Sequence, residues 1–125
     1  MEFATRTYAG SYICGLKRCI QMDAKMEWWE KYRWCMAKKK GLELFAPELG
    51  GSYEVFDERP LPKKIRVYCV QDVHFLPRLW DLYNEKLTDE WRTMVEDATK
   101  DRVLESQAED YDPDGPNKTL PPDGW

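Results

Sequence analysis

Apolar residues recur at helical spacing along much of the chain, and the run from Met26 to Lys40 shows the pattern clearly. Its apolar stripe consists of Trp28, Tyr32, Cys35 and Met36. Aromatic residues at this spacing pack in protein cores more often than they stack on bases, so we expect the stripe to face the core. The alternative is an exposed platform for nucleic-acid bases.

The end of this helix is predicted at Gly41. Lys38, Lys39 and Lys40 form the last turn before that glycine, where the negative end of the helix dipole favours cations. A glycine directly after such a turn is typical of the left-handed residue that stops a helix. The three lysines therefore have a structural explanation before any role in binding nucleic acid.

A second apolar stripe runs from 61 to 87, in a helix that we expect to begin near Pro62. The stripe consists of Leu61, Ile65, Tyr68, Cys69, Val73, Leu76, Leu79, Trp80, Tyr83 and Leu87. A further helix is predicted from Thr88, whose hydroxyl can cap it. With shorter helical segments at 2–6 and 15–25, these patterns predict a mostly α fold.

Prolines and glycines divide the rest of the chain. We expect residues 42–60 to form a connector that is held in place by its aromatic side chains. Residues 109–125 are rich in proline, glycine and aspartate, and predict a tail that is extended or pinned by its aromatic residues, not helical. At 125 residues the chain can bury one modest core, so we assign residues 1–108 to a single domain.

The composition excludes several classes of protein. No apolar run approaches the roughly 18 residues that a bilayer crossing needs, and residues 1–6 lack the features of a secretory signal. Cys14, Cys19, Cys35 and Cys69 form no C-x-x-C pair, and the chain has one histidine, so neither a zinc site nor a disulfide framework is indicated. We expect buried free thiols, no membrane partner and an intracellular location, nuclear or cytoplasmic.

Charge is divided unevenly between the two halves of the chain. Residues 17–40 contain eight Lys or Arg and three acids, a balance of +5, whereas residues 81–125 contain five basic residues and thirteen acids, a balance of −8. A basic front half can meet phosphates, and an acidic rear half cannot. Solvated helix faces would give the same counts.

Asp72 lies in the middle of the second apolar stripe, one helical turn after Tyr68. An ionised carboxylate beside an apolar seam needs compensation by a cation, by hydrogen-bond donors or by a metal ion. Three explanations are open from the spacing: a salt bridge to a neighbouring helix, a position at the edge of the stripe in water, or a metal site.

The longer run RPLPKKIRVYCVQDVHFLPRLWDLYNEKL, from Arg59 to Leu87, resembles the third exonuclease motif of the ribonuclease D-like, DEDD-superfamily 3'–5' exonucleases. The segments GLKRCIQMD, LFAPELGGSYEVF and VLESQ are similar to fungal members of that family. The resemblance implies that Asp72 is the fourth metal-binding carboxylate and that Tyr68 orients the attacking water, as in the tyrosine (DEDDy) subgroup. It also implies that Lys63, Lys64 and Arg66 approach a phosphate, although exposed lysines at a helix start are common.

In such a family the implied reaction is metal-dependent hydrolysis of nucleic acid from a single-stranded 3' end. Two divalent cations, Mg²⁺ or Mn²⁺, would activate the water and stabilise the leaving oxygen, and aspartate oxygens are the hard ligands that these ions prefer. A tyrosine hydroxyl can hydrogen-bond the attacking water.

The chain departs from the family pattern because it contains no D-x-E, the motif that supplies the first two ligands. We therefore expect the C-terminal helical part of a ribonuclease H-like α/β exonuclease fold, whose two metals this chain does not bind alone. Three hypotheses follow: an exonuclease by descent that another chain or a longer product completes, a catalytically inactive helical module that binds nucleic acid or protein, or a truncated product with exposed apolar stripes.

Overall fold

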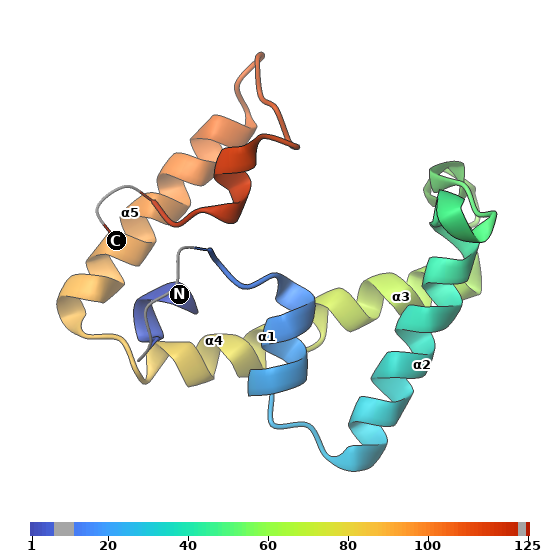
Figure 1. Ribbon diagram of the computed structural model, residues 1–125, viewed down its shortest axis with the longest axis horizontal. Helices are drawn as coiled ribbons and strands as arrows, with labels where there is room; N and C mark the ends of the chain where they lie inside the picture. Colours follow the sequence, from blue (N-terminus) through green and yellow to red (C-terminus); the bar gives the residue numbers. More distant parts are fainter. Residues whose placement is uncertain (7–11, 123–124) are drawn as a thin grey trace.

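The computed structural model describes residues 1–6, 12–122 and 125, and these residues form helices and no β-strand (Figure 1). The α-helices are α1 (Leu16–Asp23), α2 (Trp28–Phe45), α3 (Lys63–Val73), α4 (Leu76–Asn84) and α5 (Asp89–Ser106). Short 3₁₀ helices are η1 (Phe3–Thr5), η2 (Pro47–Leu49), η3 (Tyr53–Phe56) and η4 (Pro116–Thr119). The expectation of a mostly α chain is confirmed, and the ribonuclease H-like fold stays a prediction.

Two helix pairs organise the fold. Helices α2 and α3 pack against each other at one end of the molecule, α1 contacts α4 in the middle, and α5 with the C-terminal segment lies at the other end (Figure 1). The larger core cluster joins α1, α2 and α4 and consists of Cys19, Ile20, Ala24, Trp34, Phe75, Leu79 and Tyr83. The smaller cluster lies between α2 and α3 and consists of Phe45, Ala46 and Ile65. The basic stretch 17–40 and the acidic stretch 81–125 therefore meet where α1 contacts α4, and the Tyr83 hydroxyl donates a hydrogen bond to Asp23 at 2.7 Å there.

The prediction that Gly41 ends its helix is wrong. Helix α2 continues to Phe45, and Gly41 is a buried residue inside it. A Cβ at Gly41 would lie 2.4 Å from Cδ2 of Tyr68, so the glycine leaves the space that the tyrosine of α3 occupies. The three lysines before it consequently lie within the helix and not in its last turn.

The prediction that the first stripe faces the core is also wrong. Trp28 is 79% exposed and Tyr32 is 62% exposed, whereas Trp34, outside the predicted stripe, is 1% exposed. The buried face of α2 follows Trp34, Gly41 and Phe45, which are separated by seven and four residues. Cys35 is exposed too, so the expectation of buried thiols fails there, while Cys19 is buried.

The helix predicted over 61–87 is in fact two helices. Helix α3 ends at Val73 and α4 begins at Leu76, with Pro77 in its first turn. A proline has no N–H to donate to the residue four positions earlier, here Val73, and its ring crowds that carbonyl. The break lies where this missing hydrogen bond would have joined the two helices.

The remaining segments agree with the sequence more closely. The Thr88 hydroxyl accepts a hydrogen bond from the Trp91 N–H at 3.3 Å and caps α5 as predicted. The connector is held by Phe45, whose ring lies 5.7 Å from that of Tyr53 and 5.2 Å from that of Phe56. The tail is pinned by an aromatic contact, as expected, but it contains the 3₁₀ turn η4, which the sequence did not predict.

Candidate functional site

Asp72 lies on α3 at the edge of the interface with α2, and its carboxylate has a partner. The Lys38 Nζ of α2 donates to Asp72 Oδ1 at 2.5 Å. The Asp72 side chain is 37% exposed and that of Lys38 is 14% exposed. Among the explanations left open by the sequence, the salt bridge to a neighbouring helix is therefore confirmed.

The same lysine also contacts Tyr68. Its Nζ lies 3.4 Å from the centroid of the Tyr68 ring, within the range of a cation–π interaction. Lys38 thus touches both residues that the resemblance assigns to the active site. The spacing of four residues brings Tyr68 and Asp72 to one face of α3, as expected.

Tyr68 is positioned by α2 over two turns of that helix. Its ring packs over the flat backbone of Gly41 and lies 5.0 Å from the Phe45 ring, edge to face at 75°. Lys38, Gly41 and Phe45, which hold the ring, are three and four residues apart and share one face of α2. The tyrosine orientation is therefore fixed by packing.

The arrangement does not fit the two divalent cations that the resemblance implies. One carboxylate, Asp72, faces this site, and an ammonium group already neutralises it. Within the described part of the chain, no group of three or more His, Cys, Asp or Glu side chains is placed to hold a metal ion. A two-metal site needs several oxygen ligands, so these residues do not make one.

A groove of about 420 Å³ lies between α2 and the start of α3, and it is rich in cations. Its lining consists of Tyr32, Arg33, Met36, Ala37, Lys40, Lys63, Lys64 and Val67. The structure thus brings Lys63 and Lys64 together, whereas Arg66, exposed on the same helix, does not line the groove. Four cations from two helices converge here.

The cations of this groove are not neutralised within the protein. Arg33, Lys40, Lys63 and Lys64 are all exposed, and across residues 1–6, 12–122 and 125 none of them forms a salt bridge with a carboxylate. Clustered like charges raise the free energy of the folded chain and create a positive potential that attracts anions. The groove therefore carries a positive potential that attracts polyanions.

Exposed aromatic rings extend the groove along α2. Trp28 and Tyr32 lie one turn apart, and Trp29 carries the Arg33 guanidinium 6.0 Å from its ring centroid. Exposed rings beside cations form the surface on which bases of nucleic acids stack. The exposure of Trp28 and Tyr32 contradicts the core position, and their use as a platform for bases stays a prediction.

Sequence reasoning missed Arg33, Lys40 and Tyr32 as groove residues. A signal was present: Arg33 and Lys40 are seven residues apart, which places them on one face of the helix. What the sequence could not show is that the start of α3 lies against this face and adds Lys63 and Lys64 to it.

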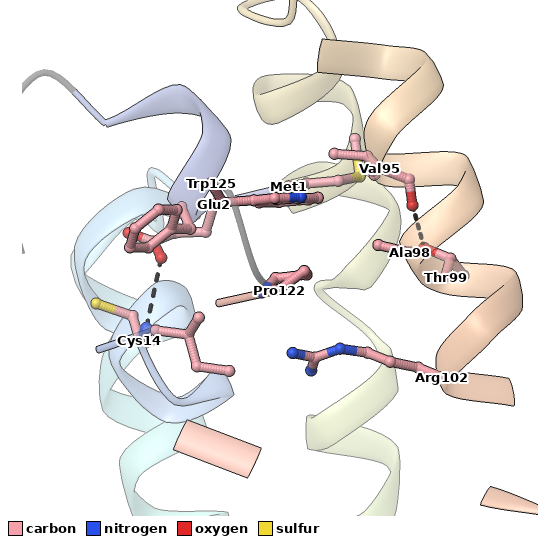
Figure 2. Close-up of a pocket in the computed structure, with 11 residues that line it drawn as sticks. Met1, Glu2, Cys14, Val95, Ala98, Thr99, Arg102, Pro122 and Trp125 are labelled. Carbon is pink, nitrogen blue, oxygen red and sulfur yellow. Dashed lines mark hydrogen bonds between the residues drawn. The ribbon is translucent and has the colours of Figure 1, made fainter. Parts of the chain in front are cut away.

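A separate cavity of about 280 Å³ lies between the N-terminal segment, α5 and the C-terminal segment (Figure 2). Figure 2 shows Arg102 extending from α5 into this cavity, on the side opposite Met1 and Trp125. Glu2, on its wall, is held by Arg6 at 2.7 Å. Burial opposes ionisation of Glu2, but hydrogen bonds from Arg6 and from the Cys14 N–H outweigh it and lower its pKa. Glu2 is thus paired with Arg6. Most of the other residues that line the cavity are apolar.

Helices α1 and α4 leave an apolar hollow of about 680 Å³. Val73, Leu76 and Trp80 on its rim are 59%, 43% and 53% exposed. Exposed apolar stripes are what the third hypothesis expects of helices that lack a covering layer.

Among the described helices, none combines the length and the apolar composition that a bilayer crossing requires. The similarity of residues 59–87 to an exonuclease motif therefore stays a prediction from sequence. Comparison of the chain with protein-family models, with characterised proteins and with solved structures finds no match.

Proposed function

We propose that this chain is a nucleic-acid-binding helical module of ribonuclease D-like 3'–5' exonuclease descent, which binds the phosphate backbone in the groove between α2 and α3. The observation that carries the proposal is the convergence of Arg33, Lys40, Lys63 and Lys64, without a carboxylate partner among the described residues, on that groove. Phosphate contacts by such cations supply most of the sequence-independent affinity of proteins for nucleic acids.

The aromatic residues distinguish nucleic acid from an acidic peptide as the ligand. An acidic peptide would be bound by the four cations alone and would gain little from exposed indole rings. Trp28 and Tyr32, at 79% and 62% exposure, offer flat surfaces beside the cations, and each stacked base contributes about 1–3 kcal/mol in proteins that use this mode. The combination of cations and rings therefore favours nucleic acid.

The salt dependence of binding tests the proposal quantitatively. Four phosphate contacts to a single strand predict a slope of log K against log salt of about −3. Fluorescence anisotropy with a labelled oligonucleotide, repeated over a range of salt, measures this slope. A Lys63→Gln/Lys64→Gln variant should reduce its magnitude by about 1.4.

A matched control removes the same charge elsewhere. Lys17 and Lys86 are exposed and lie outside the groove, so Lys17→Gln/Lys86→Gln should leave the slope close to that of the unmodified chain. Equal losses in both variants would mean that net charge, and not the groove, is responsible. A polyglutamate peptide that competes as well as the oligonucleotide would also overturn the nucleic-acid assignment.

The second candidate function is metal-dependent 3'–5' phosphodiester hydrolysis in which Tyr68 and Asp72 take part once further carboxylates are supplied. The observation that favours it is the placement of both side chains on one face of α3, and the reaction would require displacement of Lys38 from Asp72. The test is cleavage of 3'-labelled and 5'-labelled single strands with Mn²⁺, beside Asp72→Ala. Stepwise shortening from the 3' end that Asp72→Ala abolishes would establish hydrolysis. An oligonucleotide that binds but stays intact would exclude hydrolysis and leave nucleic-acid binding as the proposed function.

A further inference from the structure

The ammonium group of Lys38 has two partners in the α2–α3 interface. It lies 2.5 Å from Asp72 Oδ1 and 3.4 Å from the centroid of the Tyr68 ring. We infer that Lys38 is the built-in counter-ion of Asp72, occupying the position from which a divalent cation would have to approach the Tyr68–Asp72 pair. This assignment disagrees with the metal site that the family resemblance implies, and it does not depend on nucleic-acid binding.

The burial of Lys38 indicates a fixed partner and not a mobile surface lysine. Its side chain is 14% exposed, although lysine normally keeps its charged end in water. A desolvated ammonium needs compensation, which the carboxylate of Asp72 and the face of the Tyr68 ring provide together. Its neighbours Lys39 and Lys40 are exposed and have no carboxylate partner in the part of the chain that the structure describes.

The register of α2 places the lysine. Gly41 follows Lys38 by three residues and Phe45 follows it by seven, and all three contact Tyr68. The face of α2 that packs against Tyr68 is thus the same face that carries the Lys38 ammonium group. Asp72, one turn beyond Tyr68 on α3, completes the pair at the edge of the same contact.

A divalent cation at this carboxylate would meet two obstacles. It would coordinate an Asp72 oxygen at about 2.1 Å while facing the positive charge that already contacts that oxygen. The cation would also lack further protein ligands, because the described residues place no group of three or more acidic, histidine or cysteine side chains together. Binding of a metal ion here would require displacement of Lys38 and additional ligands.

Nuclear magnetic resonance of the folded chain tests the assignment without any activity measurement. The Hε protons of Lys38 lie over an aromatic face, so their signals should be shifted upfield by the ring current and should return toward ordinary lysine positions in Tyr68→Leu. Titration with Mn²⁺ should broaden the signals of Asp72 and Tyr68 no more than those of Glu96 and Asp101, exposed acids of α5.

A variant that removes the charge supplies the comparison. Lys38→Met keeps the apolar stem and removes the ammonium, so Mn²⁺ should then broaden Asp72 more than in the unmodified chain. Stronger broadening at Asp72 than at Glu96 in the unmodified chain, or Lys38 signals at ordinary positions, would overturn the inference. If Lys38→Met does not fold, the two measurements on the unmodified chain still decide the question.

Discussion

Replacing Gly41 by alanine should destabilise the protein even though alanine is the better helix former. In the interior of a helix this change is favourable by about 1 kcal/mol. Here the added Cβ would lie 2.4 Å from Tyr68 Cδ2 and 2.6 Å from its Cβ and Cγ, well inside van der Waals contact. The ring cannot withdraw, because Lys38 and Phe45 pack against it. Overpacking costs about 1–3 kcal/mol, so after the gain in helix propensity the net loss should reach up to about 2 kcal/mol.

Urea unfolding followed by circular dichroism measures the loss, and a double-mutant cycle identifies its cause. In a Tyr68→Ala background the ring atoms nearest the new methyl group are gone, so Gly41→Ala should cost less, with a coupling of about 1 kcal/mol. Lys39→Ala is a control on an exposed position of the same helix and should change stability by less than about 0.5 kcal/mol. A stabilised Gly41→Ala variant would show that the contact is absent. An equal cost in both backgrounds would place the clash on the Tyr68 Cβ, which lies 2.6 Å from the new methyl group and remains in Tyr68→Ala, and not on the ring.

Two further predictions concern the core and the tail. Burial and a 2.7 Å hydrogen bond to Asp23 raise the pKa of Tyr83 above its usual value near 10, so the folded state keeps a proton that the unfolded chain releases. The stabilisation that protonated Tyr83 contributes is therefore present below pH 10. Above pH 10 the free energy of unfolding should fall by up to about 1.4 kcal/mol per pH unit. Urea titrations at several pH values measure this fall, which should be absent in Tyr83→Phe. Trp125→Ala removes the edge-to-face contact with Trp91, whose centroid is 5.3 Å away, and should lower stability by about 0.5–1.5 kcal/mol in thermal melts. An unchanged pH profile, or an unchanged melting temperature, would contradict the respective contact.

Short-range signals predicted the elements that they govern. The hydroxyl of Thr88 caps α5 because a cap needs only a side-chain oxygen within reach of the first N–H groups. The start of α3 after Pro62 follows from the fixed φ of proline. The helical character of the chain and the shared face of Tyr68 and Asp72 were predicted for the same reason, since both depend on spacing within a few turns.

Signals that depend on a partner were misread. Gly41 has the local context of a helix end, but the helix continues because the glycine is needed for contact with Tyr68 and not for a left-handed turn. The stripe of Trp28 and Tyr32 has helical periodicity, which establishes a helix but not the direction that it faces. Pro77 indicated a break that the continuous apolar stripe across it obscured.

The sequence by itself determined a mostly helical chain, the cap of α5, the placement of Tyr68 and Asp72 on one face and the excess of positive charge in the front half. Only the tertiary structure decided which face of α2 is buried, which cations share a groove and which group neutralises Asp72. The physical reason is range: helix signals act within a few residues, whereas Lys38 and Asp72 are 34 residues apart. Their salt bridge exists because two helices pack in one register, a relation between segments that neither segment specifies alone.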